Sequence, residues 1–352
     1  MKICIVTVYN SYNCGSYLQA KNLERALQPL GKISFLDFKV RKVLKSYFHK
    51  IRKTAETSRN LSYILRCAIF EMGELIRLRY WWMHLDTVSI ESMNEHTDLV
   101  VLGSDEIWNI SRSGCKHPIF WGKGIEVKKI SYAPSINSAT VNDFKDGKYT
   151  KYLDELSAIS VRDSYSKEVL KNFCRKQIDI VLDPTLLYPP ENTENFTFNK
   201  PYIAVYLFYG GISKEDQLAI IDFAKRRNLA LVSAGQYIYW CNASIHSKKG
   251  NPFYIYQNAD FVITNTFHGT AYAINYHKKF VSFSKDKNKI LGLLESFELL
   301  DRVVLQPKLL EVQLERDINF EKVDELLRIY RRKSLAFIKQ FVKTKDSIYS
   351  KR

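Results

Sequence analysis

The chain lacks several features that would assign it to a well-defined class of protein. Its six cysteines include no Cys-x-x-Cys pair and no histidine at ligand spacing, which argues against a zinc site and for reduced thiols in a cytoplasmic setting. No apolar run approaches the roughly 20 residues of a membrane span, and the first run, Ile3 to Val8, is too short for a signal-peptide core. We therefore expect a cytoplasmic protein without a metal site.

Length and composition predict more than one folded domain. A chain of 352 residues, 46% of them hydrophobic, has room for two domains of roughly 150 residues each. No low-complexity tract or internal repeat is visible. We expect order over nearly the whole length, apart from a polar tail near 344–352.

Positive charge exceeds negative charge by 16, which predicts an anionic partner or surface. Much of the excess lies in Lys39 to Lys53 and Arg66 to Arg79, where leucine, isoleucine and tryptophan intersperse the basic residues. This mixture suits a peripheral contact with an anionic membrane, and it suits equally a packed helix pair with solvated lysine and arginine. No nucleic acid is expected as a partner, because the basic residues follow no recognised DNA- or RNA-binding motif.

Short apolar runs that alternate with helical patterns predict an α/β fold. The chain opens with a strand over Lys2 to Val8, a polar loop and a helix over Ser16 to Leu27. The further strand-like runs are Asp98 to Leu102, Lys129 to Tyr132, Ser157 to Val161, Asp179 to Leu182, Tyr202 to Phe208, Ala230 to Ser233, Asp260 to Thr264 and Phe280 to Phe283. This alternation is typical of parallel sheets covered by helices on both faces.

A polar, proline-bearing stretch from Pro189 to Lys200 divides the alternation into two series. We predict a doubly wound, Rossmann-like domain over 1–190, with a basic helical insertion at about 39–90. A second Rossmann-like domain is expected over 200–310, followed by a C-terminal helix and tail over 311–352. The two domains would face each other across a cleft.

Ligands of open parallel sheets collect beyond the carboxyl ends of the strands, and Arg162 falls at such a place. Its permanently charged planar fork suits a carboxylate or a phosphate, and a helix expected from Ser164 would add its positive end. The alternative is a salt bridge to Asp163 or a solvated surface position.

His268 lies at a predicted strand-to-helix turn, where an imidazole can exchange protons near neutral pH. Thr264, Asn265 and Thr266 supply hydroxyl and amide groups that can orient the ring or contact a sugar, and Gly269 permits close approach of the backbone. A single histidine also often has a purely structural role, and that alternative stays open.

The first loop and helix offer further candidate contacts to a substrate. Asn13, Gly15 and Gln19 lie where amides can hold a phosphate or a sugar hydroxyl. The segment has neither the three-glycine dinucleotide fingerprint nor a phosphate-loop lysine. A turn glycine followed by a helix-start amide would give the same pattern.

Three other positions that follow predicted strands are candidates for sugar binding. In Gly103 to Asn109, the turn residue Ser104, the carboxylate of Asp105 and the flat ring of Trp108 resemble parts of a sugar site, and Asp105 would serve equally as the cap of a following helix. Ser135 ends a strand at a point from which it can reach the cleft. Asp183 is expected to be mainly structural.

Five ordered motifs make the chain resemble the polysaccharide pyruvyltransferase family. The resemblance runs from the loop-helix at 13–20 to about Arg302, through 103–109, 131–135, 159–163, 182–185 and the Phe-His-Gly turn within 260–270. It implies a GT-B-like fold and transfer of pyruvyl from phosphoenolpyruvate to two hydroxyls of a sugar, with formation of a cyclic ketal and release of phosphate. No cofactor is implied beyond this donor.

The resemblance assigns roles to two residues by position. Arg162 corresponds to the arginine that follows the family's Ile-Ser-Val strand, and would hold the donor anion. His268 corresponds to the histidine of the Phe-His-Gly turn, and would assist the departing phosphate or shuttle a proton. The acceptor would be a sugar or lipid-linked oligosaccharide, a precursor of a surface glycan, at the inner face of the plasma membrane.

Two positions depart from the family pattern. Cys14 stands where relatives usually have an aromatic residue, and Lys289 stands where they often have arginine, so Lys289 would contact the donor phosphate without bidentate geometry. Two other functions stay open: a GT-B glycosyltransferase that uses a nucleotide-sugar, and a non-enzymatic nucleic-acid-binding protein.

Overall fold

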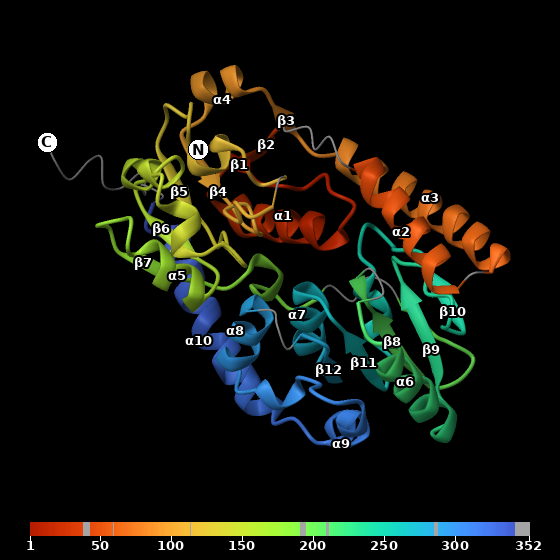
Figure 1. The fold of residues 1–352 in the computed structure, drawn as a ribbon. Helices are drawn as coiled ribbons and strands as arrows, with labels where there is room; N and C mark the ends of the chain where they lie inside the picture. The colour runs from red at the N-terminus through yellow and green to blue at the C-terminus, as the bar shows by residue number, and fades with distance from the viewer. Residues whose placement is uncertain are drawn as a thin grey trace, which may run out of the picture.

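Two five-stranded parallel sheets with helices packed against them form the framework of the molecule (Figure 1). The computed structural model describes residues 1–37, 43–58, 60–112, 114–190, 195–208, 211–284 and 288–341. The strands are β1 (Lys2–Val6), β2 (Lys32–Leu36), β3 (Thr87–Val88), β4 (Leu99–Leu102), β5 (Lys129–Ser131), β6 (Ile159–Val161), β7 (Ile178–Ile180), β8 (Tyr202–Tyr206), β9 (Ala230–Ala234), β10 (Ala243–Ile245), β11 (Phe261–Thr264) and β12 (Lys279–Ser282). The α-helices are α1 (Cys14–Leu27), α2 (Val43–Ser58), α3 (Leu61–Met83), α4 (Ile90–His96), α5 (Ser164–Leu170), α6 (Lys214–Arg226), α7 (Phe267–Asn275), α8 (Asn288–Ser296), α9 (Leu310–Glu315) and α10 (Phe320–Lys339).

The two sheets repeat one topology. Their strand orders are β3-β2-β1-β4-β5 and β10-β9-β8-β11-β12, with all strands parallel. In each sheet the chain starts at the central strand, builds outward to one side, and then crosses to the other side. This order places a topological switch point between β1 and β4 and another between β8 and β11. We call the part with β1 to β7 the N-terminal half and the part with β8 to β12 the C-terminal half.

The sequence of the central strands explains their place in the sheet. All five residues of β8, Tyr-Ile-Ala-Val-Tyr, and all four of β4, Leu-Val-Val-Leu, are buried. Continuous apolar runs of this kind suit parallel strands that are covered on both faces. The predicted α/β class is therefore confirmed, while the domain boundary near 190–200 stays a prediction, since residues 191–194 lie outside the described part of the chain.

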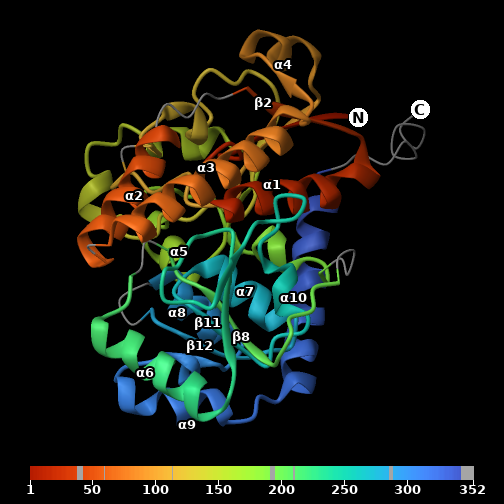
Figure 2. The same cartoon turned by 90° about the vertical axis from the view of Figure 1, so that its right-hand side faces the viewer.

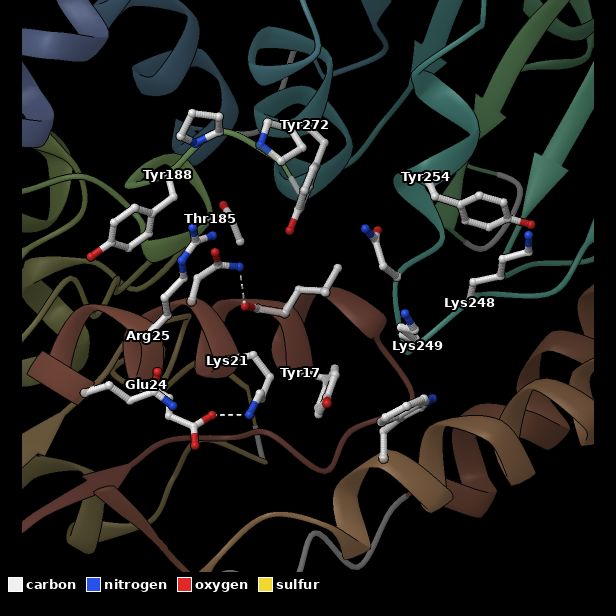
Figure 3. Close-up of a pocket in the computed structure, with 17 residues that line it drawn as sticks. Tyr17, Lys21, Glu24, Arg25, Thr185, Tyr188, Lys248, Lys249, Tyr254 and Tyr272 are labelled. Atoms are coloured by element: carbon white, nitrogen blue, oxygen red, sulfur yellow. Dashed lines mark hydrogen bonds and ion pairs between the residues drawn. The ribbon is translucent and has the colours of Figure 1, made fainter. Parts of the chain in front are cut away.

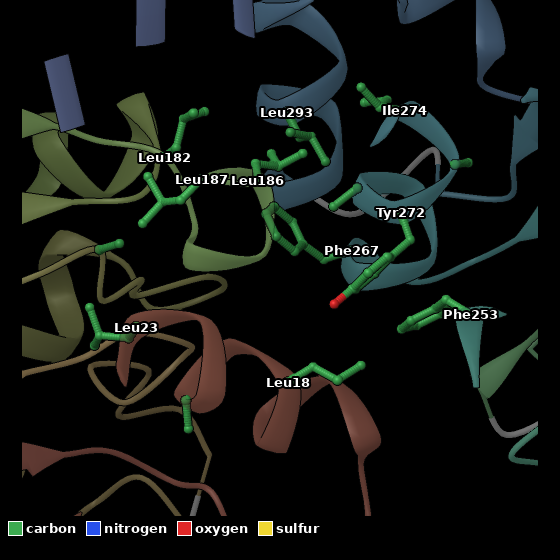
Figure 4. Close-up of a cluster of buried hydrophobic side chains, with 14 of the residues drawn as sticks. Leu18, Leu23, Leu182, Leu186, Leu187, Phe253, Phe267, Tyr272, Ile274 and Leu293 are labelled. Atoms are coloured by element: carbon green, nitrogen blue, oxygen red, sulfur yellow. The ribbon is translucent and has the colours of Figure 1, made fainter. Parts of the chain in front are cut away.

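One hydrophobic cluster joins the two halves (Figure 4). Leu18 and Leu23 of α1 lie on one side of it, and Phe267 and Tyr272 of α7 lie on the other. Leu186, from the segment after β7, packs between them. Because apolar burial is the dominant favourable term in folding, this shared cluster fixes α1 against α7.

The helix α10 runs along one side of the molecule and contacts both halves (Figure 2). Near its start, Asp324 accepts a hydrogen bond from His277 of the C-terminal half at 2.8 Å. Near its end, the hydroxyl of Ser334 accepts a hydrogen bond from the backbone N–H of Leu182 at 2.9 Å, and the ring of Phe337 lies 6.4 Å from that of Tyr132. The last helix thus completes the packing of the N-terminal half.

The predicted basic insertion forms the hairpin of α2 and α3, which stands at the edge of the molecule above β10 (Figure 1). Glu71 of α3 is buried and accepts hydrogen bonds from Lys50 of α2 at 2.9 Å and from the backbone N–H of Tyr237 at 2.8 Å. Glu74 accepts a hydrogen bond from the backbone N–H of Ser247 at 3.1 Å. Since Tyr237 and Ser247 belong to the C-terminal half, both buried carboxylates tie the hairpin to it.

Two absences concern the described residues alone. No helix among them is both long enough and apolar enough to cross a bilayer. No disulfide joins any of the six cysteines, all of which fall within the described ranges.

Candidate active site

The loops at the two switch points meet in the middle of the molecule. Gly15 opens α1 in the N-terminal half, and His268 lies in the first turn of α7 in the C-terminal half. A Cβ atom added to Gly15 would lie 2.1 Å from Nδ1 of His268. The backbone of α1 and the imidazole of α7 are therefore in direct contact.

This contact gives a test of the site's geometry. The φ angle of Gly15 does not lie in the left-handed region, so the space beside His268 is the reason for glycine here. We expect Gly15→Ala to displace the imidazole. A shift of about 1 Å in a group that takes part in a reaction lowers the rate about 100-fold, so the predicted catalytic role of His268 implies a loss of that size in kcat. The measurement is kcat of Gly15→Ala beside that of the control Gly114→Ala, in which the added Cβ has no atom within 4 Å. Full activity in Gly15→Ala would show that the contact is unimportant.

Arg162 is buried at the end of β6 and reaches toward α7. Its Nη1 donates a hydrogen bond to Asp183 at 2.8 Å and lies 3.9 Å from a carboxylate oxygen of Asp105. Its guanidinium carbon lies 4.1 Å from the ring centre of Phe267, the neighbour of His268. The predicted alternative, a salt bridge to Asp163, is wrong, because Asp163 caps α5 by accepting a hydrogen bond from the backbone N–H of Ser166.

The cap at Asp163 also changes the expected role of the helix that follows. The carboxylate of Asp163 is bound at the first turn of α5 and neutralises the partial positive charge of the helix N-terminus. The helix therefore adds little positive charge beside Arg162. The guanidinium itself is therefore the main source of fixed positive charge at this point.

Unsatisfied polar atoms mark the space around Arg162 and His268. Both Nε and Nη2 of Arg162 are buried without a hydrogen-bond partner, and so is Nε2 of His268. Buried polar atoms are nearly always paired in folded proteins, so unpaired ones call for an explanation. Two guanidinium donors and one imidazole nitrogen match the needs of an oxyanion ligand and a proton transfer beside it.

Burial and charge act in opposite directions on these groups. Burial lowers the pKa of His268, the carboxylates of Asp183 and Asp105 partly offset this, and the charges of Arg162 and Lys289 lower it further, so the net pKa lies below the ordinary value of 6.5. Burial would raise the pKa of Asp183, but Arg162 and His268 outweigh it and hold that pKa below its usual range. At neutral pH the imidazole is therefore uncharged and the carboxyl is ionised.

Asp105 has a strained backbone conformation and a side chain that is fixed by a hydrogen bond. Its φ of 72° lies in the left-handed region, which costs about 1–2 kcal/mol for a residue with a Cβ. Its carboxylate accepts a hydrogen bond from Ser16 at 2.9 Å. The cap function considered for Asp105 is wrong, because residues 106–112 form turns and not a helix, and the side chain instead faces Arg162 and α1.

A second group of charges surrounds Glu106. Lys289 of α8 forms an ion pair with it, Arg112 lies 3.5 Å away, and Asn137 donates a hydrogen bond at 3.0 Å. Burial would raise the pKa of Glu106, but Lys289 and Arg112 hold it well below its usual range. Lys289 is thus placed near the site, with its charge already paired.

Two cavities lie beside α7, the smaller at Phe267 and the larger at Tyr272. The smaller, of about 230 Å³, is lined by Arg162, Asp183, Phe267, Lys289 and Lys333 among others. The larger, of about 440 Å³, lies between α1 and the C-terminal half (Figure 3). Its lining is rich in basic and aromatic side chains, namely Lys21, Arg25, Lys248, Lys249, Tyr17, Trp81, Tyr188, Tyr254 and Tyr272, and it also contains the acid Glu24, which forms an ion pair with Lys21.

A family model described as polysaccharide pyruvyl transferase matches residues 13–287. The chain belongs to this family. The match includes Gly15, Asp105, Arg162, Asp183 and His268, while Lys289 lies just beyond its end. Among curated protein sequences, none matches the chain. Membership of the family makes the protein a transferase with a sugar acceptor.

Solved structures support the fold independently. The chain is similar to Arabidopsis thaliana UGT89C1 complexed with UDP-L-rhamnose, at 11% identity and a TM-score of 0.53 over 94% of both chains. It is also similar to S. aureus MnaA in its UDP co-structure, at 11% identity and a TM-score of 0.50 over 95% of this chain and 91% of the other. The GT-B-like fold expected from the sequence is confirmed.

The interpretation of Trp108 as a platform for a sugar ring is wrong. The indole is fully buried, stacks on Trp121 at 4.8 Å and donates a hydrogen bond to the carbonyl of Phe120 at 2.7 Å. An aromatic residue in a turn motif is also a good core residue, and here the loop folds inward onto the core. Trp108 thus anchors in the core the loop that carries Asp105 and Glu106.

Several predicted contact residues are engaged within the protein. Gln19 is fully buried, with its carbonyl oxygen accepting a hydrogen bond from Ser104 at 2.6 Å and its amide donating to Thr7 at 3.1 Å. The hydroxyl of Ser135 donates to Asp163 at 2.7 Å. In this structure Gln19, Ser104 and Ser135 position the loops and do not reach a cavity.

The residues around His268 play similar supporting roles. The side chain of Asn13 caps α1 by accepting from the backbone N–H of Gly15, and Thr266 caps α7 by accepting from that of Gly269. Asn265 accepts a hydrogen bond from the backbone N–H of Phe208 at 2.7 Å. Thr264 is fully buried, and its hydroxyl lies where a Cβ at position 269 would clash, which explains the glycine there.

Glu106, Arg112 and Ser16 are site residues that the sequence interpretation missed. The only local signal was the position of Glu106 next to Asp105, in the same turn after β4. Among the residues that the structure describes, no group of three or more potential ligands is placed to hold a metal ion.

Proposed function

We propose that the protein transfers pyruvyl from phosphoenolpyruvate to two hydroxyls of a sugar and forms a cyclic ketal. The supporting observation is Arg162, a buried guanidinium with two unpaired donors that lies over the ring adjacent to His268. A planar fork of this kind suits a carboxylate or a phosphate, and phosphoenolpyruvate carries both.

The donor would occupy the smaller cavity, which Arg162, Lys289 and Lys333 line. Arg162 would bind one anionic group through its free Nε and Nη2. The ammonium of Lys289 would contact an oxygen of the donor while it stays paired with Glu106, because a single ammonium can contact more than one oxygen. The ion pair with Glu106 would keep this lysine oriented when no donor is bound.

The reaction requires two protons to move. One sugar hydroxyl attacks C2 of phosphoenolpyruvate while the methylene carbon gains a proton and becomes a methyl group. The phosphate then leaves, and the second hydroxyl closes the ketal. One hydroxyl proton thus ends on carbon and the other on phosphate, so the scheme balances without a cofactor.

We assign a proton-accepting role to His268. Its pKa is lowered by burial, so the ring is neutral at pH 7 and can take a proton from an attacking hydroxyl. The unpaired Nε2 is the atom available for this transfer. The resulting imidazolium would be stabilised by Asp183 and Asp105 and could pass this proton to the methylene carbon, while the proton of the second hydroxyl would end on the departing phosphate.

The acceptor would bind in the larger cavity, on the other side of α7. Its aromatic side chains suit the apolar faces of sugar rings, and its four cations suit an anionic group attached to the sugar. A sugar or oligosaccharide on a phosphate-linked lipid carrier combines these properties. We place the reaction in the cytoplasm, at the inner face of the membrane.

Calorimetric titration with phosphoenolpyruvate and with a panel of nucleotide-sugars tests the proposal. We expect phosphoenolpyruvate to bind and the nucleotide-sugars not to bind. Release of inorganic phosphate from phosphoenolpyruvate should then depend on an added glycan acceptor. Binding of a nucleotide-sugar in its place would identify a glycosyltransferase and overturn the assignment.

A further inference from the structure

The exposed face of α3 carries a continuous apolar stripe. Its members are between 42% and 80% exposed, against a buried opposite face. We define the α3 stripe as Leu61, Leu65, Ile69, Met72, Ile76, Tyr80 and Met83. Two other apolar residues of the basic segment Arg66 to Arg79, Leu75 and Leu78, lie on the buried face of α3 and are not part of the stripe.

The spacing keeps the α3 stripe on one side of the helix. Consecutive members are three or four residues apart throughout, which matches the period of a straight α-helix. At 100° per residue they fall within an arc of roughly 100°. Over 23 residues the helix is about 35 Å long. A straight stripe of this length fits a flat surface better than a supercoiled partner helix.

The charges beside the α3 stripe are all positive. Arg79 lies on one flank, and Arg66 and Arg77 lie on the other; all three are exposed. The only acids of α3, Glu71 and Glu74, are buried on the opposite face. Exposed apolar residues between arginines, without an exposed acid, are the pattern of helices that lie in the interface of an anionic bilayer.

We propose that the exposed face of α3 docks the protein on an anionic lipid surface. A second copy of the chain is the other possible occupant of a long apolar face. Pairing two α3 helices along their stripes would bring six arginines together, which is unfavourable in the absence of acids. An anionic lipid surface instead satisfies the arginines and the apolar side chains at once.

The docking face adjoins the larger cavity. Tyr80 of the α3 stripe packs edge-on against Trp81, with ring centres 5.3 Å apart, and Trp81 lines that cavity. The buried face of α3 is tied to the C-terminal half through Glu71 and Glu74. A protein resting on α3 would therefore present the cavity mouth near the lipid headgroups, where a lipid-linked acceptor would be found.

Co-sedimentation of the full-length protein with vesicles tests the docking surface. We expect binding to vesicles of phosphatidylcholine mixed with phosphatidylglycerol, and weak binding to phosphatidylcholine alone. Ile69→Gln/Met72→Gln/Ile76→Gln should reduce the partition constant about 10-fold or more. Arg66→Gln/Arg77→Gln/Arg79→Gln should reduce it about 100-fold and weaken its dependence on salt.

Matched variants control for general effects of charge and apolar surface. Leu218→Gln/Val312→Gln/Ile329→Gln removes apolar side chains that are 53%, 58% and 53% exposed on other helices. Lys123→Gln/Lys145→Gln/Lys308→Gln removes three exposed cations elsewhere. Both are expected to bind vesicles as the unmodified protein does. All positions changed are exposed or partly exposed, so the fold should be retained, and circular dichroism checks this.

Three results would overturn the proposal. One is equal vesicle binding by the α3 variants and the controls, and another is no binding to anionic vesicles at all. The third is a dimer in solution that Ile69→Gln/Met72→Gln/Ile76→Gln converts to monomer, which would make α3 an interface between copies. Vesicle binding needs neither donor nor acceptor, so its outcome is independent of the proposed reaction.

Discussion

Replacement of Arg162 with alanine is expected to weaken binding of phosphoenolpyruvate by roughly 100-fold to 1000-fold, because it removes a buried, directional contact to an anion. It should also lower the free energy of unfolding by about 3–5 kcal/mol, since Asp183 is left buried without its partner. Calorimetry and denaturant unfolding measure the two effects separately.

A second substitution separates binding from stability. In Arg162→Ala/Asp183→Asn, the asparagine carries no charge, and its oxygen can still accept the hydrogen bonds that Thr185 donates to Asp183. We expect this variant to recover much of the lost stability and to remain unable to bind the donor. Donor binding at the original affinity in the double variant would show that Arg162 acts only as the partner of Asp183.

Replacement of His268 with alanine is expected to lower kcat by roughly 100-fold to 10,000-fold, the range for loss of a general acid or base. The affinity for phosphoenolpyruvate should change little, because Arg162 holds the anion. Steady-state kinetics measures the loss in kcat, and a direct titration with phosphoenolpyruvate measures the affinity. The exposed His96 on α4 provides the control, and His96→Ala should retain full activity. Parallel loss of binding and turnover in His268→Ala would instead indicate a structural histidine.

The pH dependence of kcat follows from the same residue. The pKa of His268 lies below 6.5 because of burial, so the neutral form dominates at pH 7. A base is active in its neutral form, and we therefore expect kcat to hold steady from pH 7 to 6.5 and to fall only at lower pH. A rise in kcat as the pH falls below 6.5 would mean that the protonated ring is the active form.

The sequence predicts strands at the positions of β1, β4 to β9, β11 and β12, and it misses β2, β3 and β10. The inner strands β4 and β8 are buried on both faces and form unbroken apolar runs in the sequence. At the edges of the sheets, β3 has two residues and β10 has three that are only partly buried. Such short edge strands form because a neighbouring strand is already in place, and they carry no local pattern of their own.

The same distinction applies to the site. Arg162 and His268 were predicted because each follows a strand, where ligands of parallel sheets bind, and because the resemblance to the family points to both. The pairing of Arg162 with Asp183, and the ion pair of Glu106 with Lys289, join residues 21 and 183 positions apart. The first contact depends on how the segments after β6 and β7 pack together, and the second depends on the packing of one half against the other. A local pattern contains neither.

The path of α10 has a consequence for the order of folding during synthesis. The N-terminal half contributes Tyr132 and Leu182 to a packing surface that Phe337 and Ser334 complete. At a ribosomal rate of about 5–20 residues per second, the roughly 150 to 200 residues that separate the members of each pair take on the order of 10 to 40 s to appear. During that interval the surface awaiting α10 is open to other apolar segments, so the nascent chain is a natural client for chaperones until its last helix emerges.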